Sequence, residues 1–326
     1  MLGRSRQAVH LLSMSSVAKH GFTSSTVISR AQLRVGVCQI DVGADKDANI
    51  LTAKNALTEA ASQGSNLVVL PECWNSPYST ACFPEYAETV PSIGQSPCSK
   101  ESPSYKMVCD VAKKAGVWVV GGSIPERDMS SGSEKLFNTC IVVNPDGEVV
   151  GKHRKVHLFD IDVPGKITFK ESDSLTGGDS LTVVDTPWGG LGVGICYDIR
   201  FPEMALLMRQ EMGCNLLVYP GAFNMTTGPA HWELLQRARA VDNQLFVITC
   251  SPARDASPNP VYTAWGHSSV VNPWGDVISK AGSEPSIVYA DLDLSEVDTM
   301  REGIPCWNQK RVDIYGSTLK NGKSKL

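Results

Sequence analysis

Short apolar runs alternate with longer amphipathic segments from residue 33 to residue 292, and this alternation predicts an α/β fold. Residues 33–39 alternate apolar and polar positions like a half-buried strand, whereas the uninterrupted run 67–70 is typical of a strand buried on both faces. The same two patterns predict further strands at 117–122, 138–143, 148–152, 181–184, 191–195, 216–219, 245–250, 267–271, 276–278 and 287–292.

Helical spacing of apolar residues predicts four helices between these strands. Asn49 and Ser104 are candidate N-caps of the first two, because their side chains can accept from the free N–H groups of a first turn. In the last helix we expect Leu234, Leu235, Ala238 and Val241 on the inward face. The predicted helices cover 50–62, 104–114, 204–212 and 230–243.

Turn signals divide the chain further. Two Asn-Pro-x-Gly sequences at 144–147 and 272–275 are strong hairpin signals, whereas 161–180 is expected to be irregular. No linker-like break and no internal repeat interrupts the alternation. We therefore predict one α/β domain over 33–315, followed by a polar tail at 316–326.

Composition excludes several classes of function. A formal net charge of −4 over 326 residues implies no basic face, so we expect no nucleic-acid partner. No apolar run reaches the roughly 18–20 residues of a membrane span, so no membrane association is expected. The 10 cysteines lack CxxC pairs and the 6 histidines lack metal-ligand spacing. These patterns fit reduced, mostly buried thiols, and we expect no metal and no other cofactor.

Residues 1–32 differ from the rest of the chain. They are basic and rich in serine, and the first acidic residue of the sequence is Asp41. This composition is typical of a mitochondrial transit peptide, and we expect a mitochondrial location. The alternative is a disordered tail that is bypassed by a start at Met14, which would leave the protein in the cytoplasm.

One cysteine, Cys196, falls where the predicted strand 191–195 gives way to a helix start at Pro202. A nucleophile at such a turn projects from the sheet edge, and the N–H groups of the turn point at the same place. These groups can lower the pKa of a thiol and can bind an oxyanion. On this stretch alone, a small buried core residue explains the pattern equally well.

Two further polar groups follow predicted strands upstream. Glu72 comes just after 67–70, at a sheet edge where α/β active sites usually lie, although a lone Glu there is more often an exposed loop acid. Lys155 lies in the basic run 152–155, which is either a solvated charge run or the site of one lysine turned inward against an acid. Glu171 is a candidate partner for that lysine by chain order alone.

The order of Glu72, Lys155 and Cys196 resembles the nitrilase (carbon–nitrogen hydrolase) superfamily. The three contexts are LPEC, HRKVHLF and GICYDIRFPE, and the resemblance covers essentially 33–315. Three separated motifs in this order are highly specific. Within the superfamily the chain resembles the omega-amidase branch of the Nit-type amidases, on the segments PECWNSPY (71–78), FPEYAE (83–88), HLFDIDVPGKITF (157–169) and YPGAFNMTTGPAHWELLQ (219–236).

The resemblance implies an αββα sandwich that forms homodimers, with the tail after residue 296 crossing the interface. It also implies that Glu171 positions the lysine and the catalytic glutamate. The residues themselves support amide hydrolysis through a thioester. Cys196 would attack the amide carbon, Glu72 would move the protons, and Lys155 and the backbone N–H of Tyr197 would hold the oxyanion.

Omega-amidases act on 2-oxo acids with a terminal amide, such as 2-oxoglutaramate and 2-oxosuccinamate. The resemblance therefore implies a small-molecule 2-oxo acid monoamide as substrate. Its carboxylate requires a cation, and Arg200 is the candidate because a guanidinium can bind a carboxylate bidentately. The alternative is a structural pair of Arg200 with Glu203 or Asp198. Candidate pocket walls are Tyr78, Phe223, Thr227 and Trp265, although residues of these types more often only pack in the core.

Two rival functions use the same fold. The sister branch hydrolyses deaminated glutathione with the same nucleophile, and a roomier pocket near Tyr78 and Trp265 would favour it. A catalytically idle scaffold, from a different class, would also keep the fold. The intact Glu72, Lys155 and Cys196 argue against the scaffold, because a scaffold has no need of all three.

Overall fold

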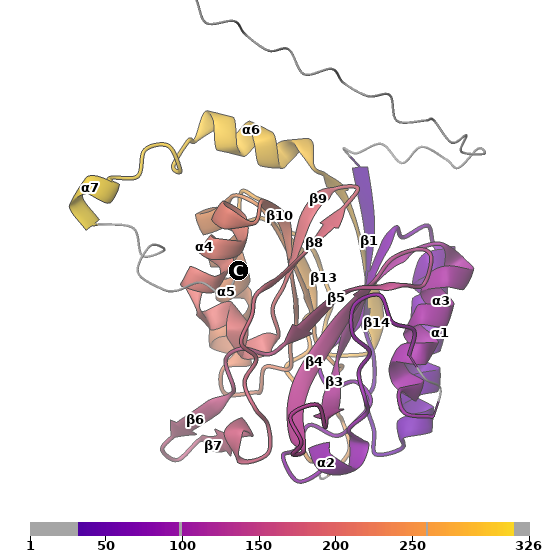
Figure 1. Cartoon of the computed structure of the whole chain (residues 1–326). Coiled ribbons are helices and arrows are strands. Elements are labelled where there is room, and N and C mark those ends of the chain that lie inside the picture. Colours follow the sequence, from indigo (N-terminus) through magenta and orange to yellow (C-terminus); the bar gives the residue numbers. More distant parts are fainter. Residues whose placement is uncertain (1–31, 98–99, 259, 316–326) are drawn as a thin grey trace, which may run out of the picture.

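Two six-stranded mixed sheets form the centre of the computed structural model, which describes residues 32–97, 100–258 and 260–315 (Figure 1). The expected transit peptide, apart from its last residue Gln32, and the polar tail at 316–326 lie outside the described residues. None of the helices in the described part of the chain is long and apolar enough to cross a bilayer.

The two sheets have the same strand topology. In each sheet the three neighbouring central strands pair in parallel, and each flanking strand pairs antiparallel with its neighbour. The two halves of the chain thus build the same arrangement without an evident sequence repeat. The first sheet runs in the order β14 (Ser286–Asp293), β1 (Gln32–Gln39), β2 (Leu67–Val69), β3 (Trp118–Asp128), β4 (Lys135–Val143), β5 (Val149–Arg154). The second runs β13 (Val277–Lys280), β12 (Ser269–Val271), β11 (Phe246–Cys250), β10 (Cys214–Pro220), β9 (Gly189–Val193), β8 (Thr182–Thr186).

The sheets pack face to face, and helices cover both outer faces (Figure 1). Helices α1 (Lys46–Ser62) and α3 (Pro103–Ala115) lie on the first sheet, and α4 (Pro202–Glu211) and α5 (Gly228–Asn243) lie on the second. This confirms the expected αββα sandwich. Burial on both faces explains the uninterrupted apolar runs, and each such side chain contributes roughly 1.5–3 kcal/mol relative to exposure. Fully buried side chains of the core between the sheets include Val35, Val37, Leu67, Val69, Leu191, Val193, Leu216 and Val218.

Short elements connect or extend the sandwich. Helix α2 (Phe83–Tyr86) precedes α3, and the 3-10 turn η2 (Cys196–Arg200) joins β9 to α4. The segment 161–180 is not wholly irregular, because it lies partly in a hairpin of β6 (Asp160–Val163) and β7 (Ile167–Lys170) and in the 3-10 turn η1 (Glu171–Asp173). Helix α6 (Ser295–Gly303) packs against the sandwich, where Val297 is buried and Arg301 donates to the carbonyl of Cys214 at 2.8 Å. Helix α7 (Val312–Tyr315) follows it and extends away from the sandwich (Figure 1).

The predicted caps of the first two helices were wrong. The N-cap of α1 is Asp45, whose side chain accepts from the N–H of Ala48 at 3.0 Å. Asn49 lies inside the helix and is buried, where it closes the preceding loop by hydrogen bonds of 2.8 and 2.9 Å to the backbone of Gly43. Ser104 likewise lies inside α3, which follows Ser102. A polar residue that closes a loop and one that caps a helix have the same local sequence signature.

The inward face predicted for α5 was only partly right, because Leu235 packs against the core and Ala238 is half-buried, but the other two residues are not inward. Leu234 and Val241 are 63% and 44% exposed, whereas Trp232 and Arg239 are buried. The Arg239 guanidinium donates to the carbonyl of Ile199 at 2.9 Å. The helix therefore docks partly through buried polar contacts, which a search for apolar periodicity assigns to solvent.

Candidate active site

The predicted catalytic residues follow strand ends of both sheets. Glu72 follows β2, Lys155 directly follows β5, and Cys196 follows β9 as the first residue of η2. Glu171 opens η1 after the β6–β7 hairpin. Glu72, Lys155 and Glu171 are 0% exposed and Cys196 is 3% exposed. The four side chains are therefore buried where strands of the two sheets end.

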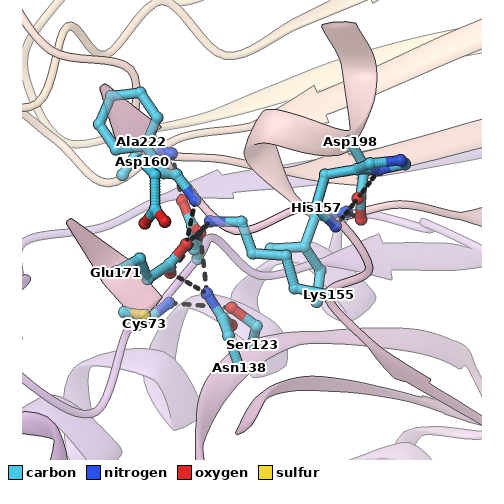
Figure 2. A network of polar contacts seen from close by, with 12 residues as sticks. Cys73, Ser123, Asn138, Lys155, His157, Asp160, Glu171, Asp198 and Ala222 are labelled. Atoms are coloured by element: carbon cyan, nitrogen blue, oxygen red, sulfur yellow. Dashed lines mark hydrogen bonds and ion pairs between the residues drawn. The ribbon is translucent and has the colours of Figure 1, made fainter. Parts of the chain in front are cut away.

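The Lys155 ammonium binds two carboxylates at once. Its Nζ lies 2.9 Å from Glu72 Oε1 and 2.9 Å from Glu171 Oε2, and Figure 2 shows it pointing toward Glu171. Burial by itself lowers the pKa of Lys155, but attraction by Glu171 and Glu72 outweighs it and raises the pKa well above its ordinary value. The lysine of the basic run is thus turned inward and charged.

Glu72 is held by four donors. Its Oε1 accepts from Lys155, from Asn138 Nδ2 at 2.9 Å and from the Tyr78 hydroxyl at 3.4 Å. Its Oε2 accepts from the backbone N–H of Ala222 at 2.8 Å. A buried carboxylate with this many donors has one orientation, which aims it at a fixed point of the site.

Glu171 occupies the opposite side of the ammonium. Its Oε2 accepts from the N–H of Phe159 at 2.7 Å, and Asn138 Nδ2 lies 3.4 Å from its Oε1. Burial, and then repulsion by Glu72, raise its pKa although Lys155 acts in the other direction. The single lysine therefore neutralises the two acids only in part.

A close backbone approach fixes the loop that carries Glu72. The Trp74 indole donates to the carbonyl of Gly121 at 2.8 Å. The next residue, Gly122, has a φ of +61°, and a Cβ there would lie 2.2 Å from the carbonyl oxygen of Pro71. Only glycine both adopts this positive φ readily and leaves room for the Pro71 carbonyl.

Cys196 lies at a strained turn. Its φ of +47° is in the left-handed region, which a residue other than glycine adopts at a cost of roughly 1–2 kcal/mol. The pKa of the Cys196 thiol is raised by burial and then by the Glu72 charge, although Lys155 lowers it. The next residue, Tyr197, lies in the first turn of η2, where backbone N–H groups have no acceptor within the helix.

Aromatic rings enclose this cluster. Tyr78 and Tyr262 stack with centroids 4.5 Å apart, and Phe159 packs edge-on against Tyr197 at 5.3 Å. Phe169 lies 5.6 Å from both Tyr78 and Phe159. A cavity of about 220 Å³ opens beside the cluster, and its walls include Glu72, Cys73, Tyr78, Ala222 and Tyr262.

Arg200 lies at the end of η2, half-buried among aromatic rings. Its guanidinium carbon is 4.6 Å from the Phe223 ring centroid and 5.6 Å from that of Tyr197. One terminal nitrogen lies 3.2 Å from His231 Nδ1, and the buried Nε has no partner among the described residues. Burial lowers the pKa of Arg200, because no anion compensates the lost hydration.

The structural pairing considered for Arg200 does not form. No carboxylate in the described ranges makes an ion pair with it. Asp198 is instead engaged by His153 and His157, and Glu203 is exposed at the start of α4. Arg200 is therefore available to an anionic ligand.

The other candidate pocket walls have different surroundings. The Thr227 hydroxyl lies 3.3 Å from Asn224 Oδ1, at the start of α5. Trp265 packs beside His267, with centroids 4.4 Å apart. Neither side chain lines the described cavity beside Glu72, so their assignment as substrate contacts stays a prediction.

Known proteins resemble this chain over most of its length. The model of the carbon-nitrogen hydrolase family matches residues 34–302. The chain belongs to the carbon–nitrogen hydrolase family. It is 54% identical to the omega-amidase NIT2 of Bos taurus over 285 residues, which cover 87% of this chain and 97% of that protein. It is 52% identical to the chloroplastic omega-amidase of Arabidopsis thaliana over 87% of this chain and 74% of that protein.

A solved structure supports the fold of this carbon–nitrogen hydrolase. The crystal structure of Saccharomyces cerevisiae Nit3, a member of branch 10 of the nitrilase superfamily, superposes with a TM-score of 0.77. The two chains are 41% identical, and the match covers 89% of this chain and 100% of Nit3. The C. elegans NitFhit protein superposes with the same TM-score at 32% identity, over 88% of this chain and 67% of that one.

Sequence reasoning missed two residues of the site. Asn138 is buried and donates to both carboxylates, yet it sits inside the predicted strand 138–143. Its amide at the start of an apolar run was the available signal, because a buried amide needs polar partners. Tyr262, whose hydroxyl donates to the carbonyl of Ala222 at 2.5 Å, lies in a loop without any pattern of apolar and polar residues that would single it out.

In the described parts of the chain, no cluster of three or more His, Cys, Asp or Glu side chains could hold a metal ion.

The charge of Glu72 should control the ionisation of Cys196. Glu72→Gln removes a negative charge that disfavours the thiolate, so the pKa of Cys196 should fall. Alkylation of Cys196 by iodoacetamide, followed by peptide mass spectrometry as a function of pH, should move to lower pH. The exposed Glu203→Gln serves as the control and should leave the profile unchanged. If alkylation of Cys196 in Glu72→Gln required the same pH as in the wild type or a higher one, this electrostatic account would be contradicted.

Proposed function

We propose that this carbon–nitrogen hydrolase is an omega-amidase that hydrolyses the terminal amide of 2-oxo acids such as 2-oxoglutaramate. The observation that carries the proposal is the burial of Cys196 together with Glu72, beside an ammonium that is held by two carboxylates. Relatives that are 52–55% identical over most of the chain bear the name omega-amidase. The products would be the 2-oxo dicarboxylate and ammonia.

The geometry supports the following first half-reaction. Glu72 takes the thiol proton as the sulfur attacks the amide carbon, which avoids a free thiolate in a site that disfavours one. The carbonyl oxygen becomes an oxyanion, which Lys155 Nζ and the N–H of Tyr197 stabilise. One such donor is worth about 3–4 kcal/mol. Glu72 then gives its proton to the nitrogen, ammonia leaves, and a thioester remains on Cys196.

Water completes the reaction. Glu72 takes a proton from a water molecule, and the resulting hydroxide attacks the thioester carbon. The same two donors hold the second oxyanion. The C–S bond breaks, and the proton on Glu72 returns to the sulfur. Glu171 touches no reacting atom in this scheme and acts by fixing Lys155.

Arg200 would bind the carboxylate of the 2-oxo acid substrate. Its half-buried guanidinium has no anionic partner in the described chain, and a substrate carboxylate can supply two charge-assisted hydrogen bonds. The cavity beside Glu72, whose walls include neither Cys196 nor Arg200, has a volume of about 220 Å³, below the roughly 300–1,000 Å³ of typical ligand pockets. This small volume supports a short 2-oxo acid monoamide over the larger deaminated glutathione.

Ammonia release tests this substrate assignment. The protein should release ammonia from 2-oxoglutaramate faster than from deaminated glutathione, and Cys196→Ala should lower the rate by about 10⁵-fold or more, as nucleophile removal does. Preference for deaminated glutathione would move the protein to the sister branch with its mechanism intact. No Cys196-dependent release from either amide would refute the proposal and favour an idle scaffold.

Carboxylate recognition by Arg200 predicts a specific defect. Arg200→Met should raise KM for 2-oxoglutaramate about 10–100-fold, because it removes hydrogen bonds to a charged group. Arg200→Lys keeps the charge but not the planar guanidinium, so its KM should lie between those of Arg200→Met and the wild type. A small neutral amide is the control and should be turned over equally by all three. An equal defect on the neutral amide would assign Arg200 a structural role instead.

We infer that the protein forms homodimers. Large apolar side chains on the outer layer are exposed, including Leu234 (63%) and Val241 (44%) on α5 and Trp274 (51%) beside β13. On the C-terminal extension, Ile304 is 40% exposed. A second copy of the chain would cover such a surface. Sedimentation equilibrium of the full chain tests this, and a monomer at micromolar concentration would contradict it.

We also propose a mitochondrial location, from the basic, acid-free composition of residues 1–32. A reporter fused to residues 1–40 should enter mitochondria. Retention of that fusion in the cytosol would favour the downstream start at Met14.

A further inference from the structure

One buried carboxylate joins the two loops that carry the oxyanion donors. Asp198 is 0% exposed and lies in η2, two residues after Cys196. Its Oδ1 accepts from the N–H and from Nδ1 of His157, at 2.9 and 2.8 Å. Its Oδ2 lies 3.1 Å from His153 Nε2 and accepts from the N–H of Ile195 at 2.9 Å. Both oxygens are therefore fully engaged.

The two histidines flank Lys155 on either side in the sequence. His153 is the penultimate residue of β5 in the first sheet, whereas Asp198 follows β9 in the second. The Asp198 carboxylate thus holds the backbone on both sides of Lys155 against the turn that carries Cys196. Figure 2 shows His157 and Asp198 facing each other, with the Lys155 ammonium directed to the other side, toward Glu171.

The hydrogen bonds set the roles of both rings. A carboxylate only accepts, so His153 Nε2 and His157 Nδ1 must each donate. Burial by itself raises the pKa of Asp198, but the hydrogen bonds from His153 and His157 outweigh it and lower the pKa. The His157 ring also stacks on Phe201, with centroids 3.5 Å apart and planes inclined by 9°. The ring is thus fixed at its edge and at its face.

We propose that Asp198 is a positioning residue, which through His153 and His157 sets the Lys155 ammonium and the Tyr197 N–H at one oxyanion site. The two donors come from different sheets, and the Asp198 carboxylate is the polar link that touches both of their loops. An oxyanion site requires both donors within a few tenths of an ångström of their working places. Asp198 itself touches no reacting atom. The proposal rests on the proposed amidase function.

The obvious variant, Asp198→Asn, tests the link but leaves a buried histidine donor unpaired and can fail to fold. His157 offers a matched pair with 29% side-chain exposure. His157→Phe keeps the ring on Phe201 and removes the donor to Asp198. His157→Asn removes the ring but places an amide N–H close to the position of Nδ1. The two variants therefore separate the hydrogen bond from the stacking.

His157→Phe should lower kcat and kcat/KM for 2-oxoglutaramate together by about 10–100-fold, as expected for donors misplaced by up to 1 Å. His157→Asn should retain kcat to within a few-fold. A role in stability alone predicts the opposite, namely similar kcat per folded site in both variants, with differences confined to the melting temperature.

An aldehyde analogue gives the second readout. 2,5-Dioxopentanoate, in which an aldehyde replaces the amide of 2-oxoglutaramate, should form a hemithioacetal: the sulfur bonds to the aldehyde carbon, Glu72 takes the thiol proton, and the oxygen becomes an oxyanion. His157→Phe should weaken this inhibitor in proportion to kcat/KM and leave binding of the product 2-oxoglutarate unchanged. Equal inhibitor affinity in both variants and the wild type would overturn the proposal.

The failure of the amidase assignment is distinguishable from the failure of this proposal. If the wild type does not hydrolyse 2-oxoglutaramate, the amidase proposal fails. The two His157 variants are then compared by their rates of alkylation of Cys196 by acrylamide. In that reaction the sulfur bonds to the terminal alkene carbon, and negative charge develops on the amide oxygen. A ratio near one in that reaction would overturn the positioning role as well. A slower reaction confined to His157→Phe would support it.

Discussion

The structure depends on one buried ammonium. A fully buried lysine is unfavourable unless anions surround it, and Lys155 meets Glu72 and Glu171 at 2.9 Å each. Removal of one partner of such a pair costs about 3–5 kcal/mol, because a charge is left unpaired in the core. The loops that follow β2, β5 and β7 are therefore held together by the same charges that the chemistry uses.

This arrangement also explains why the nucleophile works without a free thiolate. Burial and Glu72 raise the pKa of Cys196, so the resting sulfur keeps its proton. The same Glu72 accepts that proton when the sulfur attacks, and its four donors keep it in place. The strained φ of +47° at Cys196 sets the turn that carries both the thiol and the N–H of Tyr197. Backbone strain and buried charge thus serve one geometry.

The sequence predicted the parts of this site that follow from strand ends. Glu72 and Cys196 come together because parallel strands of the two sheets, β2 and β9, end at one place, where the edge strand β5 also delivers Lys155, and local patterns locate strand ends well. The inward turn of Lys155 and its contact with Glu171 depend on pairing over a separation of 16 residues, across the β6–β7 hairpin, which no local rule encodes. Asn138 and Tyr262 were missed for the same reason. Two of the four residues predicted for the inward face of α5, Leu234 and Val241, are exposed because the helix docks through Arg239 and Trp232.

The central claim is that amide cleavage passes through an acyl group on Cys196. Acid-quenched mass spectrometry of the protein during turnover of 2-oxoglutaramate tests it most directly. The account predicts an acyl adduct on the peptide that contains Cys196, which is converted to a hydroxamate when hydroxylamine replaces water as the nucleophile. Turnover at full rate with no adduct on Cys196, or with the acyl group on another residue, would contradict it.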